Sequence, residues 1–154
     1  MFIHEVIEAL DIYKVRYALI GGFAVALHGA VRATVDIDFV ISLSEKSFAA
    51  AEKAMFSLGL RPRLPITAQD VFLYRQEYIR NRNLIAWAFV HPSNAAQAVD
   101  FVIIFDVDKI KIVNKKLGNL NVKIASIRDL IQMKKKAGRP QDLEDAKSLE
   151  YLLK

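Results

Sequence analysis

The chain of 154 residues contains no cysteine. Disulfide bonds, cysteine-ligated zinc sites and a cysteine nucleophile are therefore excluded. No apolar run reaches the roughly 18–20 residues that a membrane-spanning helix needs. The N-terminal residues include acids and have no basic segment before an apolar core, so they do not fit a signal peptide. We expect a cytoplasmic protein that does not associate with membranes.

Glycine and proline are also scarce, at 6 and 4 residues, and no Gly-, Pro- and Ser-rich linker divides the chain. There is no internal repeat and no low-complexity segment. Hydrophobic residues make up 53% and charged residues 25%, a composition that excludes intrinsic disorder. We expect one domain over residues 1–154, because a chain of this length can bury roughly 70% of its unfolded surface.

Acidic residues are outnumbered by basic ones, with 17 Asp and Glu against 22 Lys and Arg, which gives a formal charge of +5. The basic residues concentrate after Lys109. This balance favours a polyanionic partner such as a nucleotide or RNA.

Apolar spacing and capping residues predict helices at both ends of the chain and strands in the middle. We expect helices over 2–12, 23–28, 45–58 (capped by Ser44 or Ser47), a segment that begins after Ser126 and breaks at Gly138-Arg139-Pro140, and 141–153. We expect strands over 17–20, 35–41, 84–90 and 98–105, and a hairpin over 111–124 that turns near Gly118-Asn119. Residues 70–82 fit either a helix or a strand, Pro62 and Pro65 mark a loop, and 91–94 is a turn. In the last helix, the apolar side is expected to consist of Leu143, Ala146, Leu149 and Leu152. The pattern predicts an α+β or mixed α/β fold with about five strands.

A Gly-Gly pair follows the first strand. Because Gly21 and Gly22 have no Cβ, the backbone can turn sharply there and a ligand can approach closely. The free N–H groups at the start of the following helix attract anions. This pair is consistent with a phosphate-binding turn and also with an ordinary strand–helix turn.

Three aspartates are candidate metal ligands. Asp36 and Asp38 are two residues apart on an expected strand, so both side chains point to one face, while Ile37 and Phe39 point into the core. Two carboxylates on one face repel each other, and a hard cation such as Mg²⁺ removes that conflict. Asp100 is a lone charge in a very apolar strand. It needs an oppositely charged partner or a metal ion, unless it lies at a solvent-exposed end of the strand. If its strand lies beside that of Asp38, the three carboxylates converge.

The stretch from Tyr17 to Asp38, with the order Gly-Gly, His-Gly, Arg-x-Thr, Asp-Ile-Asp, resembles the nucleotidyltransferase fold of the polymerase-β superfamily. In its finer form it is similar to the small bacterial and archaeal branch related to AbiEii-type toxins. The resemblance covers most of the chain: it is strong over residues 20–41 and 124–152, and little of it extends over 61–98. It implies a sheet flanked by helices with a helical C-terminus, and a role in a toxin–antitoxin-like system.

The resemblance also implies site residues. Asp36, Asp38 and Asp100 would hold Mg²⁺ or Mn²⁺, and Asp100 would also help to deprotonate the attacking hydroxyl. The glycine pair and the amide that follows it would bind the β- and γ-phosphates of a nucleoside triphosphate (NTP). The nucleotide-binding residues are then Gly21, Gly22, Phe23, Arg32, Thr34 and Lys134, and a later acid, Asp142 or Asp145, would lie near the site.

One departure and four other residues bear on this interpretation. Phe23 stands where many relatives have a serine that helps to hold phosphate. Arg32 fits either a triphosphate contact or an ion pair with an aspartate. His28 fits the His-Gly motif but is more typical of a capping or packing group, and Trp87 and Phe89 are more typical of core than of base stacking.

The leading hypothesis is a Mg²⁺-dependent nucleotidyltransferase that moves a nucleoside monophosphate (NMP) from an NTP to a hydroxyl of RNA, tRNA or protein. The alternative is a non-catalytic nucleotide-binding or antitoxin-like module with a degenerate site and a partner protein.

Overall fold

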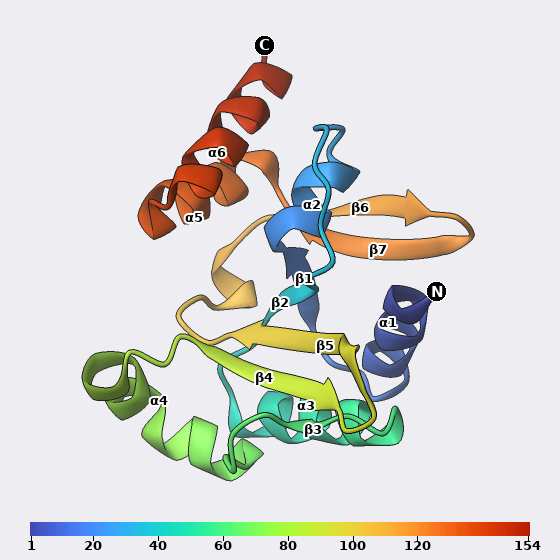
Figure 1. Cartoon of the computed structure of the whole chain (residues 1–154), viewed down its shortest axis with the longest axis vertical. Helices are drawn as coiled ribbons and strands as arrows, with labels where there is room; N and C mark the ends of the chain where they lie inside the picture. The colour runs from blue at the N-terminus through green and yellow to red at the C-terminus, as the bar shows by residue number, and fades with distance from the viewer.

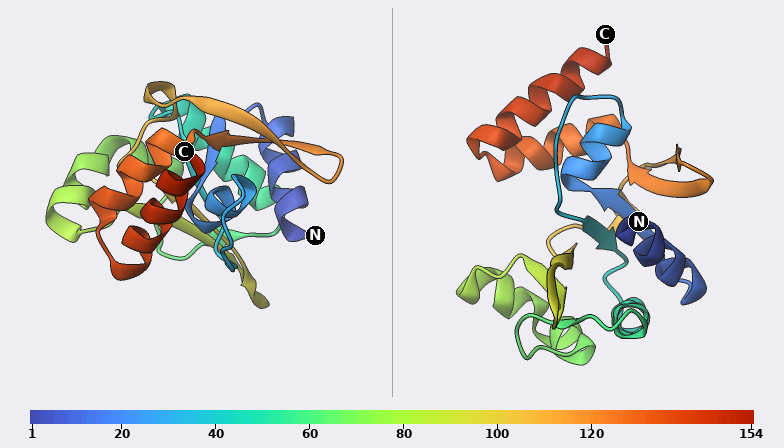
Figure 2. Two further views of the ribbon diagram at one scale, coloured as in Figure 1. Left: turned by 90° about the horizontal axis from the view of Figure 1, so that it is seen from above. Right: turned by 45° about the vertical axis from the view of Figure 1, so that its right-hand side comes forward.

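The computed structural model describes residues 1–154 and consists of a seven-stranded mixed sheet with six α-helices packed around it (Figures 1 and 2). The helices are α1 (Phe2–Ile12), α2 (Gly21–Leu27), α3 (Glu45–Ser57), α4 (Ala68–Arg82), α5 (Ile127–Ala137) and α6 (Pro140–Leu152), with a 3₁₀ turn over Val107–Lys109. The strands are β1 (Tyr17–Ile20), β2 (Asp38–Ile41), β3 (Arg61–Pro62), β4 (Ala86–His91), β5 (Asn94–Val102), β6 (Ile112–Leu117) and β7 (Leu120–Ala125). The mixed α/β class is confirmed, with more strands than the sequence predicts.

The sheet has the order β3-β4-β5-β2-β1-β7-β6. β2 runs parallel to β5 and β1 runs parallel to β7, whereas the other neighbours are antiparallel. Asp38, the first residue of β2, pairs with Ile20 of β1 on one side and with Asp100 of β5 on the other. The strand of Asp100 therefore lies beside that of Asp38, which is the condition for the three carboxylates to converge.

Buried aromatic side chains fill one face of the central strands. Tyr17, Phe39 and Phe101 are fully buried, and Phe48 of α3 packs edge-on against Trp87 at 5.9 Å between ring centroids. The expected core positions of Trp87 and Phe89 are confirmed. Because side chains alternate along a strand, Asp38 and Asp100 face away from this core, toward the side where α2, α5 and α6 lie (Figure 1).

The two C-terminal helices meet at the break that the sequence predicts. Ser126 caps α5 by accepting from the Asp129 N–H, and Gly138 ends α5 in the left-handed conformation at φ 71°. Pro140 then opens α6, where its missing N–H costs nothing.

The expected apolar side of α6 is partly wrong. Ala146 and Leu149 are buried, but Leu143 is 45% exposed and Leu152 is 38% exposed. The buried face instead includes two acids, Asp142 and Asp145. These acids can be buried because each has a cationic partner, as described below.

Strand boundaries differ from the prediction because pairing with the neighbouring strand decides where each strand begins and ends. The strand expected over 35–41 begins only at Asp38, because Ile20, its partner, is the last residue of β1 before the chain turns into α2. The strand expected over 98–105 is β5, which begins earlier, at Asn94, because β4 pairs with it as far as His91. It also ends earlier, at Val102, which pairs with Ala86, the first residue of β4.

The region that the sequence left ambiguous is helical. α4 begins at a capping box in which Thr67 accepts from the Asp70 N–H and Asp70 accepts from the Thr67 N–H. Within the expected proline loop, Arg61 and Pro62 form the short edge strand β3. No helix of the chain is long and apolar enough to cross a membrane.

Candidate active site

The glycine turn lies directly against the first aspartate of β2. Gly21 has φ 71°, a conformation that glycine adopts without strain. A Cβ on Gly21 would overlap the Asp38 carboxylate, and a Cβ on Gly22 would come 2.7 Å from Thr34 Oγ1. Glycine is therefore required at both positions because side chains from the following loop and strand occupy the space.

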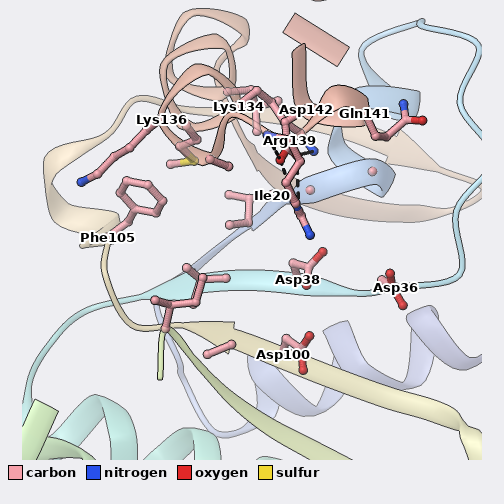
Figure 3. A pocket seen from close by; sticks show the side chains of 18 of the residues that line it. Ile20, Asp36, Asp38, Asp100, Phe105, Lys134, Lys136, Arg139, Gln141 and Asp142 are labelled. Atoms are coloured by element: carbon pink, nitrogen blue, oxygen red, sulfur yellow. Dashed lines mark hydrogen bonds and ion pairs between the residues drawn. The ribbon is translucent and has the colours of Figure 1, made fainter. Parts of the chain in front are cut away.

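Three carboxylates gather beside this turn. Asp38 and Asp100 are paired residues of neighbouring parallel strands, and Asp36 comes from the segment that precedes β2. The expectation that Asp36 and Asp38 share a strand is wrong, but both line the same cavity (Figure 3). As the side chains stand, no three His, Asp or Glu residues are arranged to bind one metal ion together.

Burial and mutual repulsion raise the pKa values of two of these carboxylates. Burial, followed by the charges of Asp100 and Asp36, raises the pKa of Asp38 to about 7, against the smaller opposing effects of Lys134 and Arg139. Burial and the charge of Asp36 also raise the pKa of Asp100. A positive charge placed between these groups would relieve both effects.

Two basic residues, Lys134 of α5 and Arg139 at the start of α6, line the cavity opposite the carboxylates, and we call them the cationic wall. The Lys134 Nζ lies 3.3 Å from Asp142 Oδ1 and 2.9 Å from Asp145 Oδ2, and the Arg139 Nε donates to Asp142 Oδ2 at 2.7 Å. Burial alone would raise the pKa of Asp142, but the hydrogen bonds and charges of Arg139 and Lys134 outweigh it and keep that pKa below its usual value. Figure 3 shows the Arg139 guanidinium pointing toward Asp38.

A cavity of about 820 Å³ lies between this wall and the sheet. Its charged part is formed by the three aspartates, the glycine pair, Arg32, Thr34, Lys134, Arg139 and Asp142, and its apolar part by side chains such as Ile85, Val102, Ile104, Phe105 and Met133. A cavity of this size can hold a nucleotide-sized ligand.

The structure brings all of the expected nucleotide-binding residues except Phe23 to the cavity, and one of them, Arg32, is held there in an ion pair. The Arg32 Nε donates to Asp145 Oδ1 at 3.1 Å, which favours the ion-pair alternative for this residue. Phe23 does not line the cavity but packs, half-buried, against the core. His28 has a structural role, because its Nε2 is hydrogen-bonded to the Ala125 carbonyl at 2.8 Å.

Sequence reasoning missed two residues at the start of α6 that line the cavity. Arg139 entered it only as part of a helix break, and Gln141, which donates to Asp145 Oδ1 at 3.0 Å, did not enter it as a site residue. The signal was present in Gly-Arg-Pro, because a residue at the start of a helix that lies beside the site can turn its side chain back into it.

Solved structures show the class of fold. The chain matches a solution structure of the antibiotic-resistance factor ANT(2'')-Ia with a TM-score of 0.66 at 14% identity, covering 99% of this chain and 83% of that one. A crystal structure of ANT(2'')-Ia in complex with adenylyl-2''-tobramycin matches with a TM-score of 0.61, also at 14% identity, over 99% and 87% of the two chains. An antigenic nucleotidyltransferase-like protein from Paracoccidioides brasiliensis matches with a TM-score of 0.57 at 17% identity, over 96% and 74%. The fold is that of nucleotidyltransferases.

Residues 1–152 match the family described as "Nucleotidyltransferase of unknown function (DUF6036)", and the chain belongs to this family. A search of curated proteins found no match. The resemblance that the Gly-Gly and Asp-Ile-Asp motifs indicated is therefore confirmed at the level of family and fold.

Proposed function

We propose that the chain transfers an NMP from an NTP to a hydroxyl acceptor with the help of a divalent cation. The observation that carries this proposal is the gathering of Asp36, Asp38 and Asp100 beside the glycine turn and opposite a cationic wall. Family membership supports the general reaction. The cation, the acceptor and the residue roles are the proposal's own.

The acidic cluster fits a divalent cation on two grounds. Its donors are carboxylate oxygens, which Mg²⁺ prefers, and burial and mutual repulsion raise the pKa of Asp38 to about 7. Asp36, Asp38 and Asp100 would hold the ion. When bound, Mg²⁺ would neutralise negative charge on the triphosphate and so lower the barrier to attack on the α-phosphorus by the acceptor hydroxyl.

The remaining residues would position the two substrates. The backbone N–H groups of Gly21 and Gly22 would bind the β- and γ-phosphates, with Lys134 and Arg139 adding positive charge beside them. The acceptor oxygen would attack the α-phosphorus in line with the leaving group. The new P–O bond forms as the bond to pyrophosphate breaks, and Asp100 would accept the hydroxyl proton.

A transfer assay tests the proposal. The protein is incubated with Mg²⁺ and each of the four α-labelled NTPs, with total RNA, tRNA, protein extract or tobramycin as acceptor, and both label transfer and pyrophosphate release are measured. Tobramycin is included because one structural neighbour was solved with adenylylated tobramycin. The Asp38→Asn variant should give no transfer.

Failure of every NTP to bind at millimolar concentration with Mg²⁺ would contradict the proposal. Metal-dependent binding without transfer to any acceptor would instead match the nucleotide-binding module. A toxin–antitoxin-like role stays a prediction from the resemblance, and a partner that co-purifies with the tagged chain would test it.

A further inference from the structure

An arginine lies beyond the acidic cluster, directly after the edge strand β3, and is separated from the cluster by β4. The Arg63 N–H donates to the Ala88 carbonyl at 2.8 Å, and Ala88 pairs with Asp100 in the sheet. Asp100 in turn pairs with Asp38, which lies against Gly21. The order across the sheet is therefore Arg63, Ala88, Asp100, Asp38, glycine turn.

The side chain of Arg63 is exposed and has no internal partner. It forms no ion pair and no side-chain hydrogen bond, whereas Arg32, Lys134 and Arg139 are all held by Asp142 or Asp145. Ala88 presents only a methyl group between Arg63 and Asp100, so the long guanidinium chain can extend over it. The charge of Arg63 already acts on Asp100, whose pKa it lowers against the larger effect of burial.

In-line transfer places the two substrates on opposite sides of the α-phosphorus. In the proposed function, the β- and γ-phosphates lie at the glycine turn and the cationic wall, so the leaving pyrophosphate lies on that side of the carboxylates. The acceptor hydroxyl must then approach from the other side, over β5, β4 and β3. Arg63 lies on this side.

We propose that Arg63, the unpaired guanidinium across β4 from Asp100, binds a phosphate of the acceptor, so that the acceptor is a phosphate-bearing hydroxyl compound such as a nucleotide or the 3′ end of an RNA. This inference rests on the proposed function. A guanidinium binds phosphate through paired N–H donors and keeps its charge at all relevant pH values. Arg63 is a specificity residue for the acceptor, on the opposite side of the cluster from the triphosphate.

A binding experiment with three small probes tests the inference. The full chain is saturated with Mg²⁺ and an α,β-methylene NTP, so that the glycine turn is filled and no transfer occurs. Binding is then measured for a short single-stranded RNA with a free 3′ hydroxyl, a nucleoside 5′-monophosphate, and the corresponding nucleoside. We expect the RNA or the monophosphate to bind more tightly than the nucleoside, and the two phosphate-bearing probes separate a polynucleotide from a mononucleotide acceptor.

Three variants separate charge from structure. Arg63→Ala should weaken binding of the phosphate-bearing probe at least tenfold, and Arg63→Lys should restore part of it. For RNA, Arg63→Ala should also reduce the slope of log K against log salt by about 0.7, the effect of one lost phosphate contact. The matched control is Arg61→Ala, two residues earlier in the edge strand β3, because Arg61 is held over the Phe56 ring at 4.8 Å and donates to the Leu60 carbonyl.

Equal binding by the wild type and Arg63→Ala, or binding of the nucleoside as tight as that of both phosphate-bearing probes, would overturn the inference. If the methylene NTP itself does not bind the wild-type protein, the proposed function fails instead, and the two failures are distinguishable.

Discussion

At the scale of single residues, the site depends on a carboxylate that the fold holds at a cost. Asp38 starts a central strand, is packed against Gly21 and lies next to Asp100. Its pKa of about 7 means that, without a cation, the folded protein holds a proton there that the unfolded chain would release. The ionised carboxylate that the proposed metal site needs therefore lowers the stability of the folded protein when no cation is bound.

Asp38→Asn should separate these two effects. The variant should lose NMP transfer on the order of 100-fold or more, because a carboxylate ligand is gone. In EDTA at pH 8 its free energy of unfolding should rise by about 1–3 kcal/mol, because a buried charge among like charges is removed. Transfer assays and thermal denaturation measure the two. Asp108→Asn, at an exposed surface ion pair with Arg16, is the control and should change neither by much; an Asp38→Asn variant that is less stable than the wild type would contradict the electrostatic argument.

Gly21→Ala tests the close approach of the turn. Gly21 and Gly118 have similar left-handed conformations, at φ 71° and 62°, so alanine at either position costs about 1–2 kcal/mol of backbone strain. Only at Gly21 does the added methyl overlap the Asp38 carboxylate. Both variants should lose stability, but Gly21→Ala should lose more and should also lose NTP binding, measured by calorimetry. Intact NTP binding in Gly21→Ala would show that this contact does not matter.

At the scale of elements, the pair α5–α6 is held by a buried ionic network rather than by an apolar seam alone. Lys134 is 9% exposed, and its partners Asp142 and Asp145 are 2% and 3% exposed. Arg32 adds the segment before β2 to this network through Asp145. The network thus fixes the cationic wall opposite the carboxylates.

Lys134→Met should be destabilising, by about 3 kcal/mol, because it removes the cation that two buried acids share and leaves them only Arg139 and Arg32. The adjacent Lys135→Met is the matched control. Lys135 is 60% exposed and pairs with Glu150 at the surface, so its loss should cost less than about 1 kcal/mol. Urea unfolding of the two variants measures the difference, and similar losses for both would show that the buried network adds little.

At the scale of the whole molecule, two distant segments, around Asp38 and Asp100, bring their negative charges together, and this should appear in the pH dependence of stability. The pKa values of Asp38 and Asp100 are raised above the unfolded value of 3.8. The folded state therefore binds more protons than the unfolded state between about pH 4 and 7, and the stability that these groups contribute declines as pH rises through that window.

Thermal denaturation in EDTA at pH 5 and pH 8, repeated with millimolar Mg²⁺, measures this effect. We expect Mg²⁺ to raise the melting temperature at pH 8 and to have little effect at pH 5, where Asp38 is protonated and the ion binds poorly. A melting temperature that does not respond to Mg²⁺ at either pH would contradict the proposed metal site.

Local chemistry explains what could be predicted from the sequence. Ser126, Gly138 and Pro140 set the ends of α5 and α6 through caps and dihedral limits that depend on near neighbours. The alternation of side chains along the strand indicated that Ile37 and Phe39 enter the core, and both are buried. The Gly-Gly and Asp-Ile-Asp motifs carried the class of fold, because they are contiguous in the chain.

Only the tertiary structure decided which distant residues meet. Asp36 lies outside the strand because β1 ends at Ile20 and offers no partner, which the segment itself does not reveal. Lys134 is paired with Asp142 and Asp145 because α6 folds back on α5. Arg63 lies across β4 from Asp100 because Ala88 of β4 contacts the segments of both residues. Strand order and helix docking are set by burial summed over the whole chain, so no local pattern encodes them.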